Sequence, residues 1–593
     1  ALQAAALLGA LLAAAAACAA RICEWCPLAT FGALWLAFVA CVSVSPALFD
    51  EKEDRLVLET GLIAAVAAAG GGTDGRSAAA KIGRSSAALL LCRVAIVSVV
   101  GKLAGECGAW RDFTALAHIH QLAPFVQQPA CWLIFMAPAP FVRALTAFGL
   151  YLEVMVTPLV LSPWRWLAHT ACALQLLSVL GAVATANLGC EPLALFALVM
   201  ALLDDSAQSC MWSQDFLTSW GCPSEKNGET KDEKEGEKEG ETDEAFEDEF
   251  TLWVVIVVVA AGAACAAAAA ATQAQLPRPG ADLALAAALV AAVAAGAWSN
   301  CRIVVHAARG RCPVLGIVAT ALCFGSVLQA TRDVHACAGL SAATAAAQMG
   351  AAWSPALPLA EWFERLHLAH TLGPVTEPLA CPTPKGRPNL LVQGAVPMEG
   401  DSIKWVDLIA RFQPNQRLDN RPVWLQPYTP RLELAMWRLV HDKAAGVLKN
   451  WPRWFLLTLD SLVNKNGSTV LLAVGREWQL PFTNAKWSWT AEMHEDVYYK
   501  AAAPLPQILV VQRWLHFEED VHSNKWWAAA APSETVASIT PPRLSKELRR
   551  AGAAEPACAA SPPWASDLPL SEAVLALFGA VLVSKLMLCW PGE

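Results

Sequence analysis

The chain has 593 residues, of which 56% are hydrophobic and 16% charged, a balance outside the usual range of soluble globular proteins. Its formal net charge of −9 equals the surplus of one stretch, residues 225–249, in which thirteen Asp and Glu face four Lys. The remainder is close to neutral, which excludes the basic face that a nucleic-acid partner needs and favours membrane lipid as the medium.

Apolar runs of about twenty residues, the length that crosses about 30 Å of hydrocarbon, recur along the chain. In order, the predicted spans cover residues 28–45, 87–103, 144–161, 167–186, 252–271, 283–298, 314–329 and 571–590. Two shorter runs, 56–69 and 192–203, fall below spanning length and are expected as half-helices buried among the others.

Composition also divides the chain along its length. The acidic stretch lacks the apolar residues that would offset the entropy of ordering, so it is expected to be a solvated linker. Three arginines between 302 and 311 mark the cytoplasmic side of the next span. That orientation puts everything after Gln329 in the lumen. We predict an α-helical polytopic membrane bundle followed by a soluble, β-rich α+β C-terminal domain. The membrane part comprises an N-terminal transmembrane bundle at 1–205, an acidic disordered linker at 206–250 and further transmembrane helices at 251–330. There follow a connecting segment with an amphipathic helix at 331–384, a lumenal soluble domain at 385–545, a linker at 546–570 and a C-terminal transmembrane helix at 571–590.

Four ionisable residues fall inside or beside the predicted spans, namely Glu59, Arg93, Lys102 and Glu153. Each costs roughly 2.5 to 3.5 kcal/mol in hydrocarbon unless it is paired, so we expect structural pairing within the bundle or at its rim. Lys102 stands four residues before Glu106, a spacing that puts both on one helix face. The alternative is a buried polar cavity, with His118 and His120 at its mouth as proton carriers.

The region 385–545 mixes strand and helix patterns. Residues 486–490 alternate as a half-buried strand does, whereas apolar residues in 453–463 recur at helical spacing. The strands are predicted at 389–396, 403–412, 469–474, 486–498 and 507–517, and the helices at 431–448 and 453–463.

Residues 405–437, WVDLIARFQPNQRLDNRPVWLQPYTPRLELAMW, combine an aromatic-led strand with Arg-Pro-x-Trp at 421–424 and Pro-Arg-Leu-x-x-x-Met-Trp at 430–437. This run resembles the lipase maturation factor family. Short segments elsewhere in the chain also match the family and occur in the family's order: 58–61 (LETG), 101–103 (GKL), 151–153 (YLE), 202–205 (LLDD), 451–455 (WPRWF) and 513–514 (RW). Where the family has Thr-Gly-Asn-Tyr-Gly, this chain has 184–189 (ATANLG).

The resemblance implies an endoplasmic reticulum membrane protein whose lumenal C-terminal domain helps secreted lipases and some other protein clients to reach their assembled state. Folding assistance requires a surface that recognises exposed apolar groups. The candidate client or partner contacts are Trp424, Arg431, Trp437, Trp454, Trp526 and Trp527, although core packing or interfacial anchoring is the simpler role for most of these tryptophans. Asn466 begins an Asn-Gly-Ser glycosylation sequon, as suits a lumenal loop.

Other functions receive less support from the residues. Cys23 and Cys26 have the spacing of a thiol–disulfide exchange motif, but no βαβ pattern surrounds them. Because no phosphate-binding loop, metal-ligand set or nucleophile elbow occurs, we expect no catalytic residue, cofactor or metal. Two alternatives stay open: a fixed architectural subunit of a larger membrane complex, and a membrane-embedded enzyme, since the bundle resembles the helical part of vitamin K-dependent carboxylases.

Overall fold

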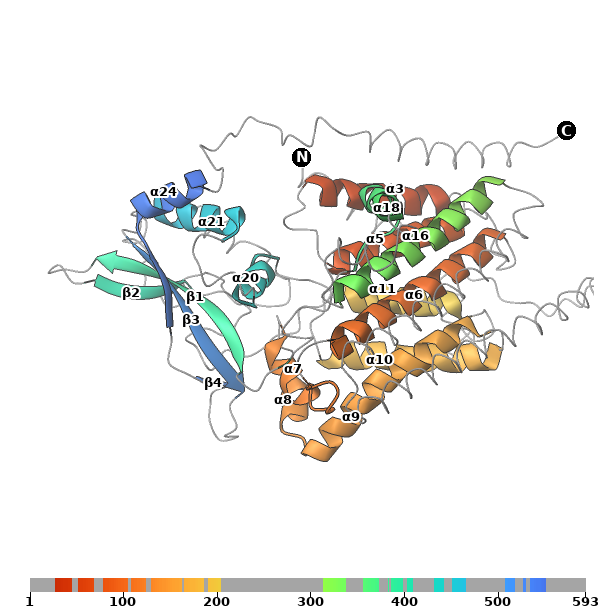
Figure 1. Ribbon diagram of the computed structural model, residues 1–593, viewed down its shortest axis with the longest axis horizontal. Helices are drawn as coiled ribbons and strands as arrows, with labels where there is room; N and C mark the ends of the chain where they lie inside the picture. Colours follow the sequence, from red (N-terminus) through yellow and green to blue (C-terminus); the bar gives the residue numbers. More distant parts are fainter. Residues whose placement is uncertain are drawn as a thin grey trace, which may run out of the picture.

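A computed structural model of the chain has a group of long helices on one side and a five-stranded antiparallel sheet with three helices on the other (Figure 1). We call these the helical region and the sheet region. The structure describes residues 27–44, 52–68, 78–104, 108–123, 130–162, 165–185, 190–203, 313–337, 356–372, 382, 386–397, 403–408, 431–441, 451–464, 507–517, 526–529 and 534–550.

The helical region is built around α6 (Ala78–Ala104), which is buried along most of its length. Four further helices gather about it and about one another: α3 (Pro27–Val44), α5 (Lys52–Ala68), α16 (Pro313–Cys337) and α18 (Ala356–Arg365). Helices α5 and α6 approach closely at Gly83, where a Cβ would overlap that of Ala67. Small residues at such a contact let two backbones pack directly, which matters in lipid because apolar side chains gain little there by association.

The rest of the helical region comes from residues 116–202. It comprises α7 (Leu116–Leu122), α8 (Ala130–Phe135), α9 (Ala139–Tyr151), a π-helical turn η1 (Leu152–Val156), a 3₁₀ turn η2 (Thr157–Leu161), α10 (Arg165–Thr185) and α11 (Glu191–Leu202). The short apolar runs at 56–69 and 192–203 form α5 and α11, and both helices contribute buried residues to the core.

The predicted span at 144–161 is interrupted in the structure. Proline at 158 has no N–H, so an α-helix cannot continue through it without leaving a carbonyl unpaired. The backbone changes to π and then 3₁₀ geometry, and the carbonyl of Leu152 accepts hydrogen bonds from Thr157 Oγ1 (3.1 Å) and Gln175 Nε2 (3.2 Å). The same carbonyl also accepts the backbone N–H of Thr157, so the Thr157 hydroxyl and the Gln175 amide reinforce the π-helical turn just before the proline.

Two of the described helices are long and apolar enough to cross a membrane, judged by length and composition: Ala79–Lys102 and Trp166–Thr185. The first is 78% buried and the second only 28% buried. The predicted spans at 28–45 and 314–329 appear as α3 and α16, whereas those at 252–271, 283–298 and 571–590 lie outside the described residues. A polytopic bundle stays a prediction.

The sheet has the order β2–β1–β3–β4, with β5 also paired to β3, and every pairing is antiparallel. Its strands are β1 (Arg387–Pro397), β2 (Ile403–Leu408), β3 (Ile508–Phe517), β4 (Trp527–Ala529) and β5 (Glu534–Ile539). Three helices bury apolar residues against its core: α20 (Arg431–His441), α21 (Arg453–Asn464) and α24 (Pro541–Arg550). The helices predicted at 431–448 and 453–463 correspond to α20 and α21.

Some boundaries in this region differ from expectation. The predicted strands at 469–474 and 486–498 lie outside the described residues, and β4, β5 and α24 were not predicted. Helix α24 also crosses the expected domain end at 545. Its Leu544 and Leu548 are buried one turn apart, whereas its other side chains are mainly charged or polar, so a short helix with two apolar anchors was taken for linker.

Candidate functional site

The centre of the helical region holds a buried ion pair between Glu59 of α5 and Arg93 of α6. The Arg93 Nη2 atom lies 2.7 Å from Glu59 Oε1, and neither side chain is more than 6% exposed. The same guanidinium donates to the carbonyl of His370 (3.0 Å) and to Ser326 Oγ of α16 (3.3 Å), while Glu59 Oε1 accepts from the His370 N–H (2.5 Å). One charge pair thus joins α5, α6, α16 and the segment after α18.

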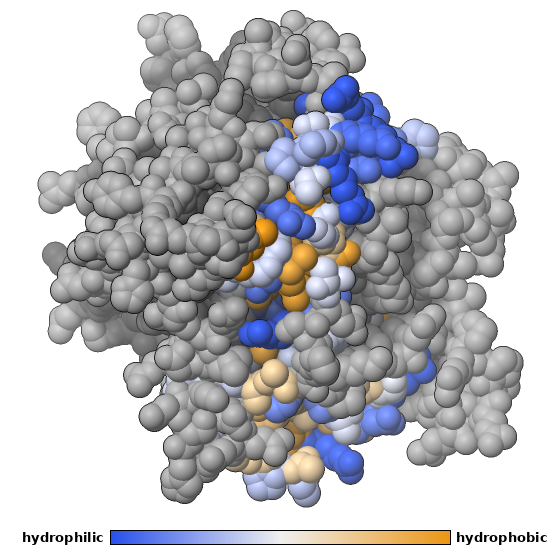
Figure 2. Space-filling model, turned by 90° about the vertical axis from the view of Figure 1, so that its left-hand side faces the viewer, coloured by the Kyte–Doolittle hydropathy of each residue, from blue (hydrophilic) through white to orange (hydrophobic). Residues whose placement is uncertain are grey.

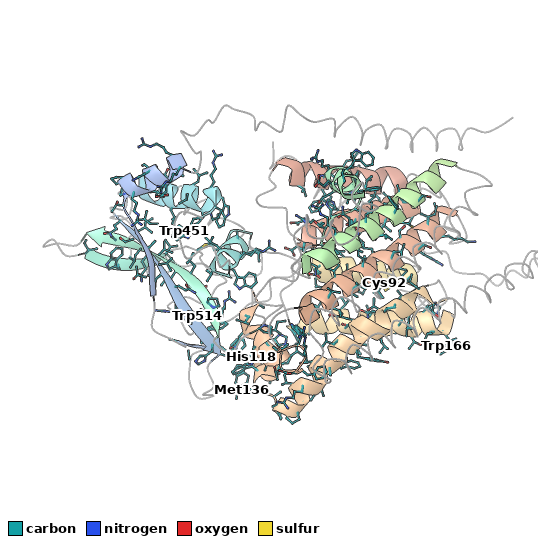
Figure 3. All side chains as sticks on the ribbon, viewed as in Figure 1. Cys92, His118, Met136, Trp166, Trp451 and Trp514 are labelled. Atoms are coloured by element: carbon teal, nitrogen blue, oxygen red, sulfur yellow. The ribbon has the colours of Figure 1, made fainter. Side chains whose placement is uncertain are left out.

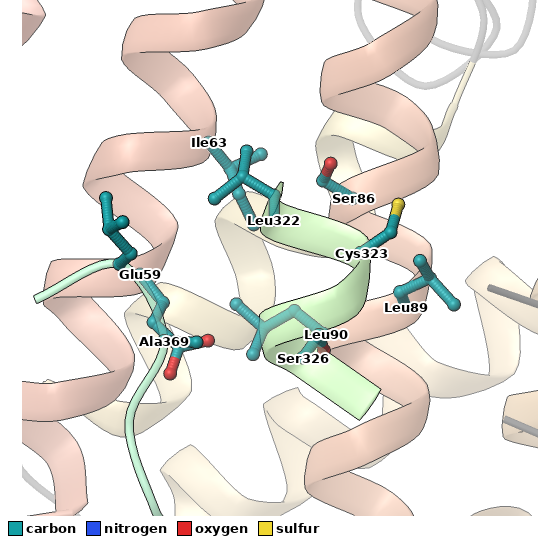
Figure 4. Close-up of a pocket in the computed structure, with 10 residues that line it drawn as sticks. Glu59, Ile63, Ser86, Leu89, Leu90, Leu322, Cys323, Ser326 and Ala369 are labelled. Atoms are coloured by element: carbon teal, nitrogen blue, oxygen red, sulfur yellow. The ribbon is translucent and has the colours of Figure 1, made fainter. Parts of the chain in front are cut away.

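A cavity of about 20 Å³ adjoins this ion pair (Figure 4). Glu59, Ser86 and Ser326 supply its polar lining, and the remainder is mostly aliphatic. The hydroxyl of Ser86 is buried without a hydrogen-bond partner there. The volume accommodates about one water molecule, so the cavity suits a structural water and is too small for an organic substrate.

A second ion pair lies at the end of α6. The Lys102 ammonium lies 2.5 and 2.7 Å from the two carboxylate oxygens of Glu153, in the π-helical turn, and 4.8 Å from the ring centroid of Trp110. The four ionisable residues singled out in the sequence therefore form two pairs, Glu59 with Arg93 and Lys102 with Glu153. Glu106, the other expected partner of Lys102, lies outside the described residues.

The two histidines considered as proton carriers lie on α7. The cavity at Glu59 is not lined by His118, His120 or Lys102. His120 is 8% exposed, and burial in apolar surroundings lowers its pKa to about 4; burial also lowers the pKa of His118. Both rings are accordingly neutral near pH 7, and His120 Nε2 is buried without a hydrogen-bond partner.

Further polar contacts tie the rim of the helical region together and were not foreseen from the sequence. Glu364 of α18 accepts from Arg332 (2.8 Å) and from Thr371 Oγ1 (2.6 Å), and Lys52 lies 2.9 Å from Glu191. These partners are up to 139 residues apart, so no local spacing signals the pairs.

The sheet region contacts the helical region through α7, α8 and the residues that follow α7. We call this contact the helix–sheet junction and define it by Gln121–Ala123 and Cys131–Phe135 on one side, and by Arg387, Trp437, Leu515–Phe517 and Trp526–Trp527 on the other. Hydrogen bonds between described residues cross it: Arg387 Nη1 donates to the carbonyl of Ala123 (2.5 Å), Trp437 Nε1 to that of Leu122 (3.1 Å), and the Phe517 N–H to Gln121 Oε1 (3.4 Å).

The bonds from Arg387 and Trp437 satisfy backbone groups that helix α7 cannot satisfy by itself. The last carbonyls of a helix have no partner within the helix and carry partial negative charge. The buried guanidinium of Arg387 and the indole N–H of Trp437 donate to two of them. The sheet region therefore caps α7 with side chains 264 and 315 residues further along the chain.

Strand β3 contributes to both the sheet core and the junction. Its register with β1 is continuous from Ile508 to Leu515, yet the buried side chains change from even positions, Ile508 and Val510, to odd positions, Leu515 and Phe517. Because successive side chains point to opposite faces of a strand, the two halves of β3 bury opposite faces. The first half packs in the core with α21 and α24, and the second packs with Cys131 and Phe135.

The tryptophans proposed as client contacts have different environments. Trp437 and Trp527 are 2% and 1% exposed, so these two rings are packed inside the fold and are not open to a client. Trp526 is half-buried against Trp132, with ring centroids 6.4 Å apart, and Trp454 is half-buried against the sheet core. Trp424, the Arg431 side chain, Asn466, Cys23 and Cys26 lie outside what the structure describes.

Apolar helices tied by buried ion pairs, with a sheet docked at one end, define a membrane protein with a β-containing C-terminal region. Residues 1–210 match the family model described as the lipase maturation factor transmembrane domain. This match, together with the curated relatives below, shows that the N-terminal part of the chain is similar to the lipase maturation factor family.

Among curated proteins, Lipase maturation factor 2 of Homo sapiens is 30% identical over 184 residues, or 29% of this chain and 26% of the relative. Those of Rattus norvegicus and Mus musculus are 29% identical over 182 and 184 residues, with the same coverage. The chain thus matches about a quarter of the length of each relative, and the family model ends before the sheet region begins. No solved structure matches the chain.

Proposed function

We propose that this protein is a membrane-bound maturation factor that assists the folding and assembly of secretory proteins, lipases among them, in the endoplasmic reticulum. The match of residues 1–210 to the lipase maturation factor transmembrane domain carries the proposal. The name of the relatives, Lipase maturation factor 2, suggests the class of client. In this proposal the protein has no catalytic step, and its sheet region faces the lumen.

The helix–sheet junction supports this role because it fixes the sheet region to the membrane region. Within the described part of the chain, hydrogen bonds from Arg387, Trp437 and Phe517 and an apolar cluster of Cys131, Leu515, Phe517 and Trp527 join them. A client that meets the sheet region is thereby held at a set distance from the bilayer, where newly translocated chains emerge. The ion pairs of the helical region act as structural ties in this reading.

Disrupting the gene in cells that secrete a lipase tests the proposal. We expect the lipase activity in the medium, per lipase molecule synthesised, to fall severalfold, while a secreted protein that is not a lipase is unaffected. Re-expression of the chain should restore the activity. Unchanged lipase secretion would contradict the proposed function, as would capture of the protein with stoichiometric, permanent neighbours in mild detergent, which favours a fixed subunit.

The same assay measures the importance of the junction. Trp437→Phe removes the indole N–H and leaves the carbonyl of Leu122 buried without it, at a cost of about 1 to 3 kcal/mol. We expect this variant to rescue lipase secretion less well than the parent chain. Trp362→Phe is the matched control, since Trp362 is 50% exposed on α18. Equal rescue by both variants would show that junction strength does not limit activity.

The glycosylation sequon at Asn466 provides an independent test of the membrane topology. Only a lumenal asparagine receives an N-linked glycan, so Asn466→Gln should increase the electrophoretic mobility of the protein, and endoglycosidase treatment of the parent chain should do the same. A cysteine label that reaches this region from the cytosolic side of intact microsomes would contradict the lumenal placement.

A further inference from the structure

Helix α10 has an exposed face that is apolar along its whole length. The exposed positions recur with the period of an α-helix, carry no charge and include one hydroxyl, that of Thr170, which is bonded to the Trp166 carbonyl: Trp166, Thr170, Ala173, Leu177, Leu180, Gly181 and Ala184. The other side of the helix is buried, with Cys172 and Val179 among the core residues. A helix that is apolar on its exposed side over 20 residues has hydrocarbon as its natural surroundings.

The ends of α10 then mark the two membrane–water interfaces. At a rise of about 1.5 Å per residue, residues 166–185 extend about 28 Å, close to the thickness of the hydrocarbon core. Trp166, 68% exposed, stands at one end, as tryptophan does at bilayer interfaces. At the other end the carbonyl of Thr185 accepts from Cys131 Sγ at 2.6 Å. Helix α8 therefore begins at the level of the second interface.

Large apolar side chains are exposed at that second level. Leu133 is 59% exposed and Met136 is 42% exposed, and Phe141, at the start of α9, is 58% exposed. Figure 3 shows Met136 and Trp166 toward opposite ends of the helical region, with Met136 next to the sheet region. Seen from the sheet end, the surface at the height of α8 and α9 includes moderately hydrophobic residues, whereas the part at the height of α24 is hydrophilic (Figure 2).

The sheet region contributes an aromatic ring to this surface. Trp526, immediately before β4, packs edge-on against Trp132 of α8 at an interplanar angle of 85°. Both rings are half-buried, and each combines an apolar body with one N–H donor. That combination suits the boundary between lipid headgroups and acyl chains.

We propose that Trp132, Leu133, Met136 and Trp526 form an interface anchor, a surface through which the sheet region itself contacts the headgroup boundary of the bilayer. Phe141 and Phe148 of α9 are exposed as well, so large apolar side chains are exposed on α8, α9 and α10 of the helical region alike. Lipid is accordingly its occupant rather than a protein client. The anchor fixes the orientation of the sheet region to the membrane plane, whether or not lipases are the clients.

Photocrosslinking to lipid tests this anchor in the full-length protein. A benzophenone amino acid is placed at Leu133 or at Trp526, and the protein is reconstituted into phosphatidylcholine vesicles that contain an alkyne-tagged phosphatidylcholine. Leu177, on the exposed face of α10, is the lipid-facing reference. Ile403, on β2, is the matched control because it is 55% exposed, close to the exposure of Leu133. Size-exclusion chromatography and the tryptic fragment pattern select variants that keep the parent fold.

After irradiation, we expect the amount of lipid label at positions 133 and 526 to lie within about a factor of two of that at position 177. It should also be at least about fivefold higher than the amount at position 403, because interfacial residues contact acyl chains and lumenal residues do not. Label at 133 and 526 no higher than at 403 would overturn the anchor. Label at 133 without label at 526 would confine lipid contact to the helices and would equally refute the contact of the sheet region. Crosslinks from 526 to captured proteins in place of lipid would identify a client surface.

Discussion

Replacement of Glu59 by Gln should weaken the helical region more than any change of a single rim charge. The variant keeps an oxygen at the site but removes the negative charge, so the guanidinium of Arg93, whose side chain is 0% exposed, loses its counterion. Leaving one partner of a buried pair unpaired costs about 3 to 5 kcal/mol. Glu191→Gln is the matched control, because its pair with Lys52 has side chains 19% and 27% exposed and contributes about 0 to 1 kcal/mol.

The assay is the apparent melting temperature of the purified protein in detergent, followed by tryptophan fluorescence at one fixed scan rate. Each kcal/mol shifts the melting temperature by roughly 2 to 4 °C in domains of 150–250 residues, so Glu59→Gln should lower it by about 10 °C and Glu191→Gln by at most about 4 °C. Adding Arg93→Met to Glu59→Gln removes both charges and should recover part of the loss. Equal shifts for the two Glu→Gln variants would refute the reasoning, as would further loss in the double variant.

Two further predictions concern packing and pH. Gly83→Ala should lower the free energy of unfolding by about 1 to 3 kcal/mol, because the new methyl group overlaps Ala67 of the facing helix. Gly181→Ala is the control, because nothing lies within 4 Å of its new Cβ. In the same melting assay this variant should be neutral or slightly stabilising. For His120, the folded state stays neutral down to its pKa of about 4, while the unfolded chain takes up a proton below about pH 6.5. Stability is therefore intact above about pH 6.5 and falls between there and about pH 4, by about 2 kcal/mol at about pH 5. His120→Gln should reduce the loss between about pH 7.5 and pH 5 by that amount, and an unchanged loss would contradict the assignment.

The local apolar pattern predicted most of the described helices, because the length and spacing of an apolar run indicate both a helix and its extent. The runs at 28–45 and 314–329 became α3 and α16, and the run at 453–463, with apolar residues at helical spacing, became α21. The break at 152–161 was missed although Pro158 signals it, since an apolar run reads as a continuous span when the proline is ignored. Strand β5 was missed because ETVASI is short and half polar.

Site geometry depends on contacts that periodicity cannot supply. The sequence suggested that Glu59, Arg93, Lys102 and Glu153 need partners, but the choice of partners follows from how α5, α6 and the π-helical turn pack. The capping of α7 by Trp437 joins residues 315 apart and has no local signal. Alternation along β3 predicts one buried face, whereas the structure buries both in turn.

The two-sided burial of β3 has a practical consequence for anyone who wishes to express residues 385–545 alone. A fragment cut at those limits loses the second half of α24, with Leu548 of the core, and also exposes Leu515, Phe517 and Trp527, which pack with Cys131 and Phe135 of α8. Such newly bared apolar surface promotes self-association. Residues 116–135, fused to the fragment or supplied as a peptide, provide the missing cover.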